Sequence, residues 1–202
     1  MDEIEIGWSE ASDLLLGWAT HDLDAGEPPR PGLLAFAGDE PLGSAMLRPF
    51  ATGQVVSALI ELLALLIPMG ADRLVLSLPG RVWSLDDPIP PVSDTVDLRT
   101  RVVVVTTADA HAGPCRTRVT LHPFEVEPQG WRWTTPVTPD EPPEAPALWA
   151  MGTLLDARHD LALDGADGQL RLAAQLGRVL LLGHELALAP AAARRLQLAS
   201  AI

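Results

Sequence analysis

Residues 98–122 read LRTRVVVVTTADAHAGPCRTRVTLH, and this stretch decides the fold class. Valine and threonine dominate both of its ends, as is typical of β-strands, whereas alanine, glycine and proline occupy the middle. We therefore expect strands at residues 98–107 and 116–122, joined as a long antiparallel hairpin. A third strand at residues 130–135 (GWRWTT) follows a short turn, which completes a three-strand meander.

The segment before this meander predicts two helices, a hairpin and a single strand. Their expected ranges are 9–20 (helix), 32–37 and 42–47 (hairpin), 53–67 (helix) and 73–78 (strand). Strands that follow one another through short connections favour antiparallel pairing. The sequence thus predicts an α+β fold with a mainly antiparallel sheet (hairpin, helix, strand, three-strand meander), helices on one face and a helical C-terminal segment.

The C-terminal third looks different from the rest because it begins with an acidic, proline-rich stretch. We expect an α+β core domain over residues 1–137, a linker at 138–146 and a helical segment at 147–202. Within the last of these, helices are expected at 147–158, at 169–189 and from 191 onward. Residues 160–163 are compatible with a strand as well. The apolar 169–189 helix needs a covering surface, either the core or a second copy in a homodimer.

The composition narrows the classes of protein. The chain has 202 residues, and a hydrophobic content of 48% disfavours disorder. Its net charge of −13 opposes binding to nucleic acid. No apolar stretch reaches the length of a membrane span, and residues 1–5 do not resemble a signal peptide. With one cysteine, the fold needs no internal disulfide. We therefore expect a cytoplasmic protein without a membrane partner.

The chain contains no lysine, tyrosine or asparagine. A/T-rich codons specify all three amino acids, so a GC-rich bacterial genome accounts for the depletion. Selection against lysine modification is the alternative explanation.

Five arginines form the only candidate binding site that strand alternation suggests. Arg99 and Arg101 share one strand face, Arg116 and Arg118 share another, and Arg132 points opposite to the two tryptophans beside it. If the strand register aligns them, the five gather on one exposed face able to bind an anionic ligand. The alternative is ordinary pairing with nearby acids, namely Asp97, Glu125 or Glu127. Trp131 and Trp133 are expected to pack under a helix.

Other chemically capable residues do not form an identifiable motif. Asp109, His111 and Cys115 lie together at the hairpin tip, with His122 further along, but their spacing matches no zinc site. His184-Glu185 lacks the second histidine of a zinc-peptidase motif, and Leu188 stands in its place. His159-Asp160 reads as a helix end. An acidic loop carries Asp86, Asp87, Asp94 and Asp97 without the glycine of a calcium loop. We expect no metal, no cofactor and no catalytic residue assignable from sequence.

These observations leave three functional hypotheses. The leading one is a non-catalytic protein–protein interaction subunit, such as an adaptor, a chaperone-like protein or an assembly component of a bacterial complex. The second is an enzyme whose site joins residues remote in sequence, starting from Asp109, His111 and Cys115. The third is a regulatory module that binds an anionic ligand on the arginine face.

Overall fold

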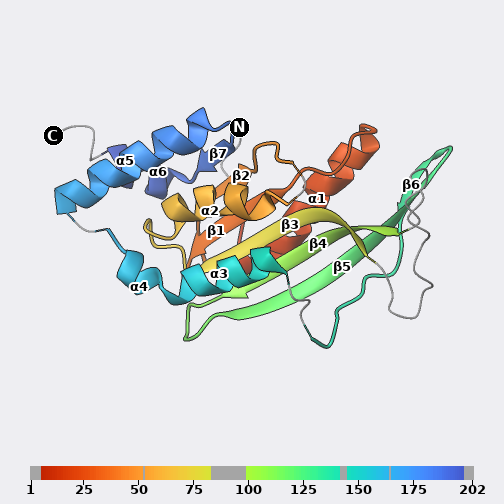
Figure 1. Ribbon diagram of the computed structural model, residues 1–202, viewed down its shortest axis with the longest axis horizontal. Coiled ribbons are helices and arrows are strands. Elements are labelled where there is room, and N and C mark those ends of the chain that lie inside the picture. Colours follow the sequence, from red (N-terminus) through yellow and green to blue (C-terminus); the bar gives the residue numbers. More distant parts are fainter. Residues whose placement is uncertain (1–5, 52, 83–98, 142–144, 164, 198–202) are drawn as a thin grey trace.

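A computed structural model describes residues 6–51, 53–82, 99–141, 145–163 and 165–197. Seven strands in this part form one antiparallel sheet in the order β6-β5-β4-β3-β1-β2-β7 (Figure 1). Their bounds are β1 Gly32–Ala37, β2 Glu40–Met46, β3 Arg73–Val82, β4 Thr100–Asp109, β5 Arg116–Glu127, β6 Gly130–Trp133 and β7 Glu185–Leu188. The predicted α+β class, the β1–β2 hairpin and the β4–β5–β6 meander are confirmed.

The helices of the described residues lie on both faces of this sheet, rather than on one face as expected. They are α1 Ala11–Asp24 (after a 3-10 turn, η1, at Trp8–Glu10), α2 Val55–Leu66, α3 Pro146–Asp156, α4 Arg158–Leu161, α5 Gly165–Leu181 and α6 Pro190–Gln197. One buried cluster joins the sheet to α2, α3, α5 and α6. A second cluster joins the opposite sheet face to α1. None of these helices combines the length and apolarity needed to cross a membrane.

Strand β1 explains why helices are needed on both faces. Its sequence, GLLAFA, is apolar without alternation, and five of its six residues are buried. Leu33 and Ala35 belong to the cluster under α2, whereas Leu34 and Phe36 belong to the cluster under α1. A strand that buries both faces reads as a continuous apolar run, and the expectation of helices on one face did not take account of this signal at 32–37.

Trp131 and Trp133 of β6 pack under a helix as predicted, and that helix is α1. The Trp131 indole N–H donates to the Asp24 carboxylate at 2.9 Å, and the Trp133 indole N–H donates to the Thr20 hydroxyl at 3.4 Å. Both rings pack against the α1 core. The far end of the meander is thereby attached to the N-terminal helix.

The prediction of a single helix over residues 169–189 is wrong. Helix α5 ends at Leu181, Gly183 adopts a positive φ of 92°, and the chain then forms β7 against the edge of β2. The positive φ permits the reversal, because only glycine adopts it without strain. Leu186 alternates with Glu185 and Ala187, a period of two that is visible in the sequence. Of residues 160–163, left open between helix and strand, Asp160 and Leu161 belong to α4, and residues 162–163 form neither a helix nor a strand.

Strands β2 and β7 approach closely at Gly43. A Cβ built at this position would lie 2.7 Å from the Ala187 carbonyl oxygen and 3.3 Å from the Leu188 Cα. Because these atoms are backbone, they cannot move aside as a flexible side chain would. The pairing of the last strand therefore depends on the absence of a side chain at position 43.

Gly43→Ala is expected to destabilise the protein by about 1–3 kcal/mol, because β7 must shift to accommodate the methyl group. Gly80→Ala is the matched control, since the nearest atoms to its Cβ are side-chain carbons at 3.7 Å in the same sheet. That variant should be neutral or up to about 1 kcal/mol more stable. Guanidinium unfolding monitored by circular dichroism measures both, and equal stabilities of the two variants would contradict the close approach.

Candidate functional site

The five arginines of the predicted binding face are not brought together. Arg101 pairs with Phe124 near one end of β4, whereas Arg116 pairs with Asp109 and Arg118 with Thr107 at the other end. At about 3.4 Å per residue, the eight-residue separation along β4 corresponds to roughly 27 Å. Arg99 precedes the start of β4, on the Arg101 side.

Arg132 lies on the sheet face opposite to that of Arg101, Arg116 and Arg118. It alternates with two tryptophans that point toward α1, and it pairs with Glu125 at 2.6 Å and Glu127 at 3.0 Å. For Arg132, the alternative of pairing with nearby acids is therefore confirmed. Anion binding by the remaining arginines stays a prediction, without a common site for all five.

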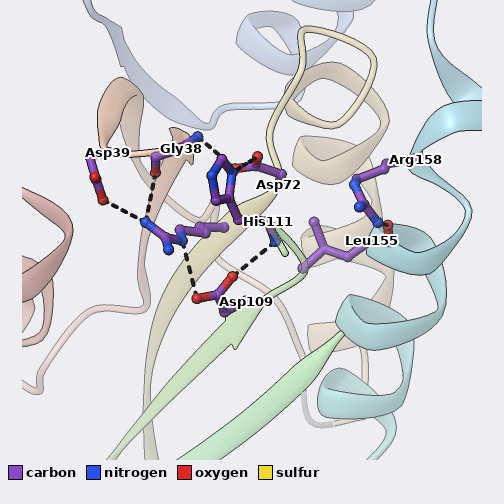
Figure 2. A network of polar contacts seen from close by, with 8 residues as sticks. Gly38, Asp39, Asp72, Asp109, His111, Leu155 and Arg158 are labelled. Atoms are coloured by element: carbon purple, nitrogen blue, oxygen red, sulfur yellow. Dashed lines mark hydrogen bonds and ion pairs between the residues drawn. The ribbon is translucent and has the colours of Figure 1, made fainter. Parts of the chain in front are cut away.

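The hairpin tip between β4 and β5 carries a polar network that sequence reasoning only partly found (Figure 2). The His111 Nδ1 lies 2.7 Å from the Asp72 carboxylate, whose other oxygen accepts from the Gly38 N–H at 2.8 Å. The His111 N–H donates to the Asp109 carboxylate at 2.9 Å. Asp72 comes from the start of β3, 39 residues before His111, so no local motif could have signalled this pair.

Arg73 occupies the centre of the same network. Its guanidinium is paired with Asp39 and lies 3.1 Å from Asp109, and its Nη1 donates to the Gly38 carbonyl at 3.3 Å. The Nε–H makes no hydrogen bond within the described residues, so its contact with Asp109 is an ion pair alone. Burial raises the pKa of Asp109, but the His111 amide and Arg73 outweigh it and lower the pKa overall. These contacts join the β1–β2 turn to the β4–β5 turn.

The surroundings of Cys115 disfavour its thiolate form. Its N–H donates to the Asp156 carboxylate of α3 at 2.6 Å, and the thiol is half-buried. Burial, followed by the nearby charges of Asp156 and Asp109, raises the pKa of the thiol to about 11. The reactive species of cysteine is the thiolate, which is scarce at neutral pH under these conditions.

Among the described residues, the remaining histidine candidates do not add a metal site. His122 lies far along β5 from the tip, edge-on to Trp133, and burial lowers its pKa. Across the described residues, no three histidine, cysteine or acidic side chains are placed to hold a metal ion. His159 lies in the short helix α4. The acidic candidates Asp86, Asp87, Asp94 and Asp97 lie outside the described residues.

His184 has a structural partner set that sequence reasoning missed. Its side chain is completely buried, its Nδ1 accepts from the Arg48 N–H at 3.1 Å, and its Nε2 lies 2.8 Å from the Glu61 carboxylate. Since Nδ1 is an acceptor, the proton of the neutral ring resides on Nε2 and is donated to Glu61. Arg48 follows β2, Glu61 belongs to α2 and His184 immediately precedes β7.

Glu61 is also clamped by Arg48, which donates from Nε at 2.7 Å and from Nη2 at 2.9 Å. These hydrogen bonds lower the pKa of Glu61 to about 2. The burial of the carboxylate acts in the opposite direction, and the hydrogen bond from His184 lowers the pKa further. Gln175 of α5 donates to the Glu61 carbonyl at 3.1 Å. The cluster therefore links the C-terminal elements to α2, and its polar atoms are occupied.

The apolar helix expected to need a covering surface is only partly covered: α5 packs one face on the core, and its outer face is exposed among the described residues. Its inner face buries Gly168, Leu172 and Val179. On the opposite side, the spacing of i, i+4, i+7 and i+11 aligns four exposed residues, Leu170, Ala174, Gly177 and Leu181. Leu170 is 68% exposed and Leu181 is 89% exposed. Leu180 and Leu182 extend the apolar surface at the same end of the helix.

Comparison of the chain with protein-family models, with curated proteins and with solved structures found no match.

Cys115 is expected to react slowly with a thiol reagent such as iodoacetamide at pH 8. A pKa of about 11 against the usual 9.0 leaves about a hundredfold less thiolate. The same protein in urea serves as the control, because unfolding removes the burial and the neighbouring carboxylates. A native rate equal to or above the unfolded rate would restore Cys115 as a candidate nucleophile.

Glu61→Gln is expected to remove an acid-sensitive part of the stability. A carboxylate whose pKa falls from 4.5 to about 2 on folding contributes its stabilisation fully above pH 4.5 and loses it as the pH falls toward 2. The shift corresponds to about 3 kcal/mol. As the pH falls from 4.5 toward 2, the free energy of unfolding of the wild type, measured in urea, should decrease by about 3 kcal/mol more than that of Glu61→Gln. Glu10→Gln, at an exposed position, is the control and should follow the wild type.

Proposed function

We propose that the protein is a non-catalytic interaction subunit, and that the outer face of α5 binds an amphipathic, acidic helix of a partner protein. The observation that carries the proposal is the row Leu170, Ala174, Gly177 and Leu181, which continues into Leu180 and Leu182. Exposed leucines in a contiguous row are costly to leave in water, and such patches are typical of docking surfaces. A cytoplasmic location belongs to the same proposal.

The shape of this face suits a helix. Leucines stand at both ends of the row, and the small residues Ala174 and Gly177 lie between them, with open space around the Gly177 Cα. Small residues let a second helix approach closely, and the leucines then pack on either side of it. Contacts between two helices are formed by side chains spaced three and four residues apart, as in this row.

The charge of α5 favours an acidic partner. The whole chain carries −13, yet the charged residues of α5 are Arg171, Arg178 and a single acid, Asp167. Arg171 and Arg178 are both exposed and lie seven residues apart, so they occupy one flank of the leucine row. An acidic side chain on the partner would meet these guanidinium groups, which supports both the rate and the specificity of binding.

A second copy of the chain fits this face less well. In a two-fold, antiparallel pairing of α5 with itself, the arginine flanks of both copies would lie on the same side and repel each other. An enzyme is also supported less well, because the hairpin-tip candidates are engaged with one another and the thiol is held in its protonated form.

The test uses the full chain as bait in a lysate of its native organism, followed by affinity measurement with the captured protein produced on its own. Leu170→Glu combined with Leu181→Glu should weaken binding by about tenfold or more, as expected for residues at the centre of an interface. Arg171→Glu combined with Arg178→Glu should weaken binding and reduce its dependence on salt. Both pairs of positions are exposed, so the fold should survive.

Val126→Glu combined with Val137→Glu is the matched control, since it places the same two charges at exposed apolar positions away from α5. It should leave the affinity unchanged. Equal binding by the leucine variant and this control would overturn the proposal. So would a wild-type chain that sediments as a dimer and becomes monomeric with Leu170→Glu and Leu181→Glu, because the occupant would then be a second copy. A bait that captures nothing would count against it as well.

A further inference from the structure

A cavity lies on the sheet face that carries α1, where this helix stops short of the last two strands. Helix α1 packs on β1, β3 and β4, whereas β2 and β7 continue the same face beyond it. The resulting cavity has a volume of about 400 Å³ and is bounded by α1 on one side and by β2 and β7 on the other. This volume is within the range of small-molecule sites in proteins.

The wall and floor of the cavity are mainly apolar. Met46 of β2 pairs with Glu185 of β7, and the neighbouring pair brings Ala187 to the same face. Trp18 of α1 forms the opposite wall. Its ring lies against Gly32, where an added Cβ would come within 3.1 Å of the Trp18 Cε3 atom. The indole is thus held in place by close packing, which provides a rigid flat surface for a ligand.

Arg30 supplies a fixed cation at the rim of the cavity. The Asp22 carboxylate, only 5% exposed as a residue, accepts the Arg30 N–H at 2.8 Å and the Nε–H at 3.3 Å. One edge of the guanidinium is therefore anchored to a buried acid. Its Nη1 lies 3.7 Å from the Glu185 carboxylate, which is too long for a hydrogen bond. Within the described residues, neither Nη group has a hydrogen-bond partner.

We propose that this cavity binds a small molecule made of a flat apolar body and a carboxylate. The body packs between Trp18, Met46 and Ala187. The carboxylate accepts hydrogen bonds from the Nη groups of Arg30, an arrangement that the planar guanidinium favours. Glu185 is 74% exposed in its side chain, so it turns toward water when the ligand carboxylate replaces it.

The charge of the ligand follows from which rim group is held in place. Arg30 is preorganised by a buried carboxylate, so little conformational freedom is lost when a ligand binds it. Glu185 has only the long contact with Arg30 among the described residues and would have to be immobilised to bind a cation. The site lies on the opposite sheet face from α5, so this inference is independent of the proposed docking surface and is tested separately.

Isothermal titration calorimetry of the full chain with 2-naphthoate tests the inference, with 2-naphthylmethylamine as the cation of the same shape. The naphthoate should bind saturably and the amine should not. Arg30→Gln should weaken naphthoate binding by about tenfold or more, because charged hydrogen bonds are lost. Glu185→Gln should tighten naphthoate binding by about twofold to fivefold, because a competing negative charge is removed.

Two further variants separate the site from general effects. Ala187→Leu fills the cavity without changing its charge and should abolish naphthoate binding even if Arg30→Gln unfolds the chain. Arg194→Gln removes a positive charge from α6 on the other face and should leave binding unchanged. The inference is overturned if 2-naphthylmethylamine binds and Glu185→Gln weakens its binding, since the site then prefers a cationic ligand. It is also overturned if Ala187→Leu leaves naphthoate binding intact, or if no saturable binding of naphthoate occurs at millimolar concentration.

Discussion

The burial of β1 and β3 on both faces is the constraint on which the arrangement of the other elements depends. Adjacent residues such as Leu33 and Leu34, or Leu74 and Val75, are all removed from water, yet they point to opposite faces. Each face must therefore be covered by helices. Helix α1 covers one face, and α2 with the C-terminal helices covers the other.

The polar interactions attach parts of the chain that are distant in sequence to this apolar centre. Arg48, Glu61 and His184 join the segment after β2, helix α2 and the segment before β7 through hydrogen bonds to one another, and Arg48 Nη1 also donates to the Pro49 carbonyl. Asp72, Arg73, Asp109 and His111 do the same for two turns at one end of the sheet (Figure 2). Buried or half-buried charges of this kind stabilise only when all of them are paired. Within the described residues, this mutual pairing connects segments that are distant in the sequence.

The two surfaces proposed for binding lie on opposite faces of the sheet and differ in chemistry. The α5 face is convex and apolar with arginines on one flank, as suits a protein helix. The cavity beside α1 is concave and small, with one arginine fixed by a buried aspartate, as suits a carboxylate on an apolar body. Both surfaces carry exposed arginines although the chain as a whole is strongly acidic. An anionic partner is therefore attracted locally at each of them.

The sequence by itself determined the strand-rich, antiparallel character of the protein and most of its elements. Local periodicity and composition predict three of these elements directly. They are the valine-rich hairpin around residues 98–122, the apolar strand at 32–37 and the helix beginning near Val55. The tertiary structure decided which residues meet. Strand β7 lies in a leucine-rich segment that resembles a helix in sequence, and it is formed by antiparallel pairing with β2. Asp72 meets His111, and Glu61 meets His184, across separations that no local pattern encodes. The five arginines illustrate the same limit. The alternation of side chains within each strand can be read from the sequence. The register between neighbouring strands, which places these arginines far apart, depends on pairing between distant segments.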